Sequence, residues 1–140
     1  MENIVNSTTG LIHLITAIIA MATGMLLLAS SKGTSRHKTT GYIYTLSMIA
    51  LNTTAFMIYE LYGKFGVFHA FAVVSSLTLI TGIYPMITKS SKNYIQTHMI
   101  YMYWSVIGLY CAFMAELFSR LPKILFTDSE FNINSFYIGV

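Results

Sequence analysis

Four histidines are the residues of this sequence most able to do chemistry: His13, His37, His69 and His98. Each lies near the start of a different apolar run. Because successive membrane spans cross in opposite directions, we expect His13 and His69 near one membrane face and the other two near the opposite face. Ionisable side chains inside a bilayer are costly and rare, so two histidine pairs at two depths favour a functional role.

Two imidazoles that face each other across a helical bundle can serve as the axial ligands of haem iron. In an up-down bundle the first and third helices are diagonal neighbours, as are the second and fourth. The sequence therefore predicts two b-type haems, one held by His13 and His69 and one by His37 and His98. From His13 to the far end of its run is about 17 residues, or roughly 25 Å, so the two haems would carry electrons across the membrane.

A flat macrocycle needs small side chains beside its ligands. Such residues at helical spacing from a histidine are Ala17, Ala20 and Gly24 after His13, and Ser105 and Ala112 after His98. Small residues are also enriched where membrane helices pack without a cofactor, so this pattern is compatible with either reading. Asn52 lies within the second run, where we expect it to form an interhelical hydrogen bond or to line a polar path.

Two carboxylates offer an alternative site. Glu60 and Glu116 close the second and fourth runs at the same face as His13 and His69. Two imidazoles with two carboxylates suit zinc, iron or manganese, which would make the chain a metal-binding or transport protein. A third interpretation is a non-catalytic membrane partner protein whose histidines bond to water or carbonyl groups in the headgroup region.

Composition and run length decide the fold class. Of the 140 residues, 55% are hydrophobic and 9% are charged, whereas soluble domains carry about 25% charged residues. The apolar runs are 11–29, 41–59, 67–87 and 94–118, each close to the roughly 20 residues that span a bilayer. Short connections make neighbouring helices antiparallel, so we predict an all-α, up-down-up-down four-helix bundle over residues 1–120. Pro122 should end the fourth helix, leaving 121–140 as a short interfacial or disordered tail.

The charges predict the orientation and exclude several functions. Five of the eight basic residues follow the first and third runs, namely Lys32, Arg36, Lys38, Lys89 and Lys92. We expect the protein in the inner (plasma) membrane, where the positive-inside rule places both termini outside the cytoplasm. Since basic residues at span ends explain the net charge of +3, we expect the lipid bilayer as partner and no nucleic acid. An electron donor and acceptor are implied but not identified, and the formation of a homodimer is left open.

No phosphate-binding loop or nucleophile motif supports a nucleotide-driven pump or a hydrolase.

Two segments carry a resemblance to known families. Ser35-Arg-His-Lys-Thr-Thr-Gly-Tyr-Ile-Tyr44 opens the second run and Gly66-Val-Phe-His-Ala70 opens the third. Both resemble a group of small bacterial four-span membrane proteins of uncharacterised function. The histidine layout also resembles the core of the di-haem transmembrane cytochrome b family, which passes electrons from ascorbate to ferric iron. That resemblance implies the same two histidine pairs and a transmembrane oxidoreductase, without the two flanking helices of that family and without its ascorbate site.

Overall fold

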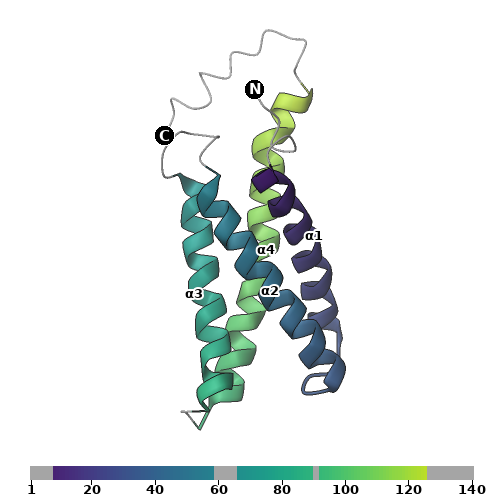
Figure 1. Cartoon of the computed structure of the whole chain (residues 1–140), viewed down its shortest axis with the longest axis vertical. Coiled ribbons are helices and arrows are strands. Elements are labelled where there is room, and N and C mark those ends of the chain that lie inside the picture. The colour runs from purple at the N-terminus through teal and green to yellow at the C-terminus, as the bar shows by residue number, and fades with distance from the viewer. Residues whose placement is uncertain (1–7, 59–65, 90–91, 126–140) are drawn as a thin grey trace.

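The computed structural model describes residues 8–58, 66–89 and 92–125 (Figure 1). This part of the chain is all-helical: α1 Thr8–Ala29, α2 Ser35–Met57, α3 Val67–Thr88 and α4 Tyr94–Leu125. The predicted helical bundle is therefore confirmed. Three helices are long and apolar enough to cross a membrane, at Thr8–Ala29, Val67–Thr88 and Tyr94–Ser119. The other helix, α2, has spanning length but carries Arg36 and Lys38 in its first turn and Asn52 in its second half.

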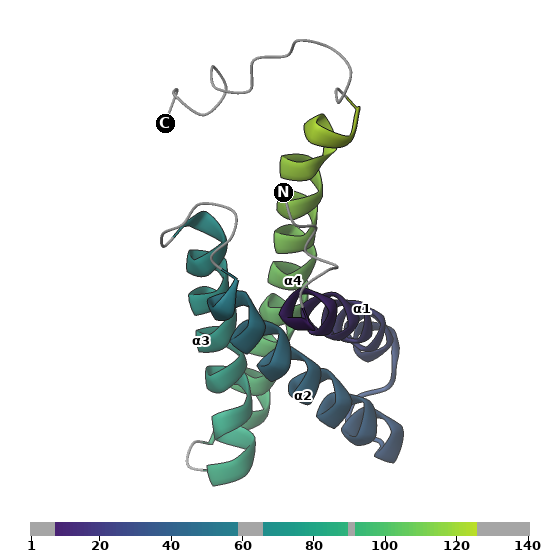
Figure 2. The same ribbon diagram turned by 45° about the horizontal axis from the view of Figure 1, so that its top comes forward.

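The four helices form two hairpins (Figures 1 and 2). α1 packs mainly on α2 and α3 mainly on α4, while the two hairpins meet over fewer residues, between α2 and α3 and between α1 and α4. Within the described residues α1 and α3 make no close backbone contact, and neither do α2 and α4. These two pairs are thus the diagonals of the bundle, and α1 begins at the end of the bundle where α4 finishes.

Two helix boundaries differ from the sequence prediction. α4 continues to Leu125, so the expected stop at Pro122 is wrong. Proline lacks one main-chain donor but has a helical φ, and α3 likewise continues past Pro85. α2 begins at Ser35, where Thr34 caps it by accepting a hydrogen bond from the His37 amide at 3.1 Å. His37 therefore lies in the first turn of α2, ahead of the apolar run that starts at Gly41. The predicted tail from 126 onward lies outside the described residues.

Residues from all four helices build the core. Its buried members are Ala20, Leu27, Tyr44, Met48, Leu51, Leu79, Val106 and Leu109. In lipid the attraction between helices comes from close packing and from interhelical hydrogen bonds. Two such bonds reach α4: Tyr44 and Ser105 pair through their hydroxyls at 2.9 Å, and the Tyr110 hydroxyl donates to the Met21 carbonyl at 3.0 Å. These bonds join the two hairpins.

Gly24 of α1 is buried and packs tightly against this core. A Cβ at this position would come within 3.2 Å of both the Tyr44 ring and a Val106 methyl, whereas a Cβ on Gly41 would meet nothing within 4 Å. Alanine favours a helix by about 1 kcal/mol over glycine, and overpacking a core costs about 1–3 kcal/mol. We therefore expect Gly41→Ala to raise the free energy of unfolding and Gly24→Ala to lower it.

Unfolding in mixed detergent micelles, followed by circular dichroism, measures both variants. Gly41→Ala is the matched control, since the same methyl group is added to a helix of the same bundle. Equal stabilisation by the two substitutions would contradict the tight packing of α1 at Gly24.

Candidate functional site: a cavity between two hairpins

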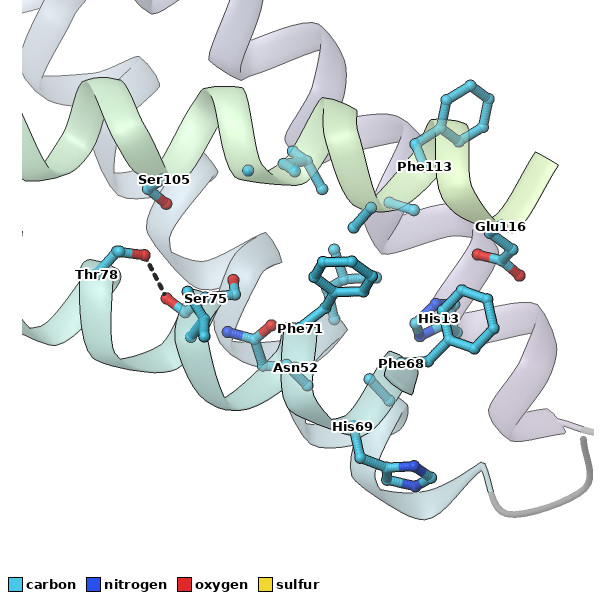
Figure 3. A pocket seen from close by; sticks show the side chains of 18 of the residues that line it. His13, Asn52, Phe68, His69, Phe71, Ser75, Thr78, Ser105, Phe113 and Glu116 are labelled. Atoms are coloured by element: carbon cyan, nitrogen blue, oxygen red, sulfur yellow. Dashed lines mark hydrogen bonds between the residues drawn. The ribbon is translucent and has the colours of Figure 1, made fainter. Parts of the chain in front are cut away.

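A cavity of about 180 Å³ lies between the two hairpins and is lined by residues of all four helices (Figure 3). Most of its wall is apolar, with small side chains such as Ala17, Ala72 and Ala112 beside aromatic ones. The polar side chains that line it are His13, Asn52, His69, Ser75, Thr78, Ser105 and Glu116. Figure 3 shows His13 and Glu116 toward one end and Thr78 and Ser105 toward the other. These are called the outer and inner ends below, the outer one lying where α1 and α3 begin.

His13 connects the two helices of the first hairpin. Its Nδ1 lies 3.0 Å from the Thr54 hydroxyl on α2. That hydroxyl already donates to the main-chain oxygens of Ala50 and Leu51, both at 2.9 Å, so it accepts from His13 Nδ1–H. The neutral imidazole then carries its lone pair on Nε2. A hydrogen bond from Nδ1 to a fixed acceptor is the usual arrangement behind a metal-bound histidine.

His69 lies in the first turn of α3 and is only 5% exposed. Its Nδ1 accepts a hydrogen bond from the Gly66 amide at 3.2 Å, which satisfies a main-chain donor at the start of the helix. In the neutral ring the proton therefore lies on Nε2. His13 and His69 thus line one cavity from diagonal helices, but the ring nitrogen that carries the proton differs between them.

The inner end of the cavity holds polar groups whose hydrogen bonds are incomplete. The Ser75 hydroxyl oxygen is buried and makes no hydrogen bond within the described part of the chain. Asn52 is 8% exposed and lines the cavity, and no hydrogen bond of its carboxamide is found among the described residues. The expected interhelical bond of Asn52 is therefore not formed there. Thr78 and Ser105 do have partners, in the Ser75 carbonyl at 2.9 Å and the Tyr44 hydroxyl.

The second histidine pair lies at the opposite end of the bundle, where α2 and α4 begin. His98 Nδ1 donates to the Gly82 carbonyl of α3 at 2.7 Å, so its Nε2 carries the lone pair. Burial, followed by the charges of Lys32 and His98, lowers the pKa of His37 below its usual 6.5. The two histidines lie near the starts of α2 and α4, which are diagonal neighbours in the bundle.

The four-ligand metal site of the sequence analysis is seen only in part. His13, His69 and Glu116 all line the cavity, but Glu60 lies in 59–65, outside the described residues. Over 8–58, 66–89 and 92–125, no three His, Cys, Asp or Glu side chains are grouped as a metal site would require.

Comparison with known proteins gives one match. Residues 10–136 match a family described as "Predicted membrane protein (DUF2306)". The chain belongs to this family. The match contains every cavity residue and continues into the segment that the sequence analysis set apart as a tail. No curated protein and no solved structure matches the chain. These comparisons do not link the chain to the di-haem cytochrome b family.

The sequence analysis missed most of the cavity wall in this family member. Ser75 and Thr78 lie one helical turn apart within an apolar run, a spacing that would have predicted a polar patch on one face of α3. The aromatic residues Phe68, Phe71, Trp104 and Phe113 gave no such signal, because an apolar run offers no contrast between residues that face lipid and residues that face a cavity.

The lowered pKa of His37 predicts how stability depends on pH. The unfolded chain takes up a proton near pH 6.5, while the folded chain does so only at lower pH. The contribution of His37 to the free energy of unfolding is therefore complete above about pH 6.5 and is lost as the pH falls through the lowered pKa. We expect His37→Gln to flatten this part of the stability profile between about pH 7.5 and about pH 5. Arg36→Gln, one residue away and exposed, should leave the slope unchanged. Identical profiles for His37→Gln and the unmodified chain would contradict the assignment.

Proposed function

We propose that this protein is a membrane electron carrier that binds two b-type haems, one through His13 and His69 and one through His37 and His98. The observation that supports the proposal most is the cavity. Its lining includes His13 of α1 and His69 of α3, two histidines that are 56 positions apart in the sequence (69 − 13) and lie on diagonal helices. Packing alone does not require two histidines on one cavity in an apolar bundle.

Several observations fit a haem at the outer pair. The cavity wall combines apolar and aromatic side chains with small residues at Ala17, Ala72 and Ala112, which leave room beside the imidazoles. His13 holds its proton on Nδ1 through Thr54, so Nε2 has the lone pair that iron requires. At the other pair, His98 is held in the same way by the Gly82 carbonyl. Each of these hydrogen bonds also joins the two helices of one hairpin.

Haem binding at His13 and His69 would require two changes in the structure. Ligation through His69 Nε2 moves the proton to Nδ1, and the hydrogen bond from the Gly66 amide is then lost. A porphyrin also needs more room than about 180 Å³, so the hairpins have to separate to admit it. Their mutual interface is the less extensive one in the bundle, and parting them there leaves each hairpin intact.

Bound haem would supply one-electron redox chemistry. The chain itself would supply the ligands, fix the orientation of two imidazoles through Thr54 and Gly82, and exclude water with its aromatic wall. Burial and hydrogen bonding of the ligands are the means by which a protein sets the potential of such a group. The protein would then act as a transmembrane oxidoreductase between an electron donor at one face and an acceptor at the other.

The basic residues support an orientation for this carrier in the inner membrane. Lys32, Arg36, Lys38, Lys89 and Lys92 are all exposed and lie at the end of the bundle away from the start of α1. The positive-inside rule assigns this end to the cytoplasm, which puts both termini and the cavity toward the outer side.

Absorption spectroscopy tests the proposal. Protein purified from haem-replete cells should be red, with a Soret band that shifts on reduction with dithionite. We expect about two haems per chain, falling to about one in His13→Ala, in His69→Ala and in the double variant, because both residues serve the same haem. His98→Ala should remove the other haem, and the double variant His13→Ala/His98→Ala should be colourless.

A control variant and a metal analysis of the same sample decide between the haem site and the alternative metal site. Thr53→Ala is the control, since Thr53 is exposed on α2 next to Thr54 and its hydroxyl donates to the Ile49 carbonyl of its own helix. It should keep the full haem content. Colourless protein from haem-replete cells would contradict the proposal, and zinc or manganese found in its place would favour the site of His13, His69, Glu60 and Glu116.

A further inference from the structure

We propose that the inner end of the cavity binds the ring of a lipid-soluble quinone. The role of the quinone as an electron donor or acceptor rests on the proposed function. The binding site itself does not, because its polar groups belong to the chain and are present without haem.

The hydrogen-bonding groups at the inner end suit a quinone. The Ser75 hydroxyl oxygen is buried and makes no hydrogen bond among the described residues. The Asn52 side chain, on a residue 8% exposed, also makes none there, and both side chains line the cavity. A buried polar group without a partner lowers the stability of the fold, so a ligand that hydrogen-bonds to the Ser75 hydroxyl is favoured at this place. Each group can both donate and accept, which matches the carbonyls of a quinone and the hydroxyls of a quinol. Figure 3 shows Asn52 and Ser75 along the same stretch of the cavity.

The surroundings of these groups select a ligand from the bilayer rather than from water. Val74 and Trp104 line the cavity and are both 58% exposed, on helices apolar enough to span the membrane. Their exposed surfaces therefore face acyl chains, and the cavity can be entered from that side. A ring-shaped, lipid-soluble molecule that carries a few hydrogen-bonding oxygens meets these conditions, while a free anion or a sugar does not.

Size agrees with a single ring. An apolar cavity of about 150 Å³ holds one benzene molecule, and this cavity measures about 180 Å³. Along α4 it extends over twelve residues (116 − 104), from Trp104 to Glu116, or about 18 Å. His13 and His69 line the outer part, so a ring beside Ser75 would lie inward of the histidines and next to a haem held by them.

Titration with decylubiquinone tests the site. Trp104 is the single tryptophan of the chain and lines the cavity, so its fluorescence reports occupancy. In full-length protein purified in detergent we expect saturable quenching. Ser75→Ala and Asn52→Leu should each raise the dissociation constant about tenfold, as expected for the loss of one hydrogen bond in an apolar site. Ser75→Ala removes a buried hydroxyl that has no partner among the described residues, so it should not destabilise the fold.

Ser76→Ala is the matched control. Ser76 adjoins Ser75 on α3, but its hydroxyl donates to the Ala72 carbonyl at 2.8 Å and does not line the cavity. It should leave the dissociation constant within about twofold of the original. Quenching that never saturates, or equal affinities in Ser75→Ala and Ser76→Ala, would overturn the proposal. If Asn52→Leu fails to fold, the two serine variants decide alone. The haem content of each sample, read from its visible spectrum, separates failure of the haem proposal from failure of this one.

Discussion

Hydrogen bonds between helices, made inside an apolar bundle, are the interactions on which this structure depends. Lipid tails are as apolar as the helix surfaces, so burial of leucine or isoleucine gives little reason for the helices to associate. The chain uses polar side chains at a few positions instead. His13 with Thr54 closes the first hairpin, and His98 with the Gly82 carbonyl closes the second. Tyr44 with Ser105 and Tyr110 with the Met21 carbonyl then hold one hairpin against the other.

This arrangement explains why the cavity lies where it does. The close packing of the two hairpins is concentrated near Gly24, Tyr44 and Val106, where small and large side chains interlock. Toward the start of α1 the packing opens and the cavity appears, lined by small residues of α1, α2, α3 and α4. Two of the interhelical bonds use histidine Nδ1, and each leaves the lone pair on Nε2. A bond that serves the fold therefore also prepares the ring for a ligand, which is the arrangement on which the haem proposal draws.

The polar side chains of this bundle differ in whether their hydrogen bonds are satisfied. Ser76, Thr23 and Thr81 donate to main-chain carbonyls of their own helices, and such bonds make a hydroxyl tolerable in lipid. The buried hydroxyl oxygen of Ser75 lacks this compensation among the described residues. Buried polar groups without partners are rare in folded proteins because they cost stability. The Ser75 hydroxyl lines the cavity, so a ligand bound there would supply the missing partner.

The sequence by itself determined the helices, their alternating direction and the membrane environment. Apolar runs of spanning length permit only a helix, and short connections permit only antiparallel neighbours. It also determined which end of the bundle each histidine occupies, since that follows from helix direction. It did not determine the end of α4, because a proline such as Pro122 can lie within a helix when one missing bond is tolerated.

Only the tertiary structure decided which side chains meet. Whether a residue of an apolar run faces lipid or another helix depends on the rotation of each helix, and a run without polar contrast carries no record of that rotation. The position of Trp104 and Phe71 on the cavity therefore follows from the packing of the two hairpins and not from the sequence pattern. The tautomers of His13 and His69 were set in the same way, by the Thr54 hydroxyl on a neighbouring helix and by the Gly66 amide three residues earlier. The residue type determines which chemistry a position can perform. The packing of the helices determines which partner the side chain meets there.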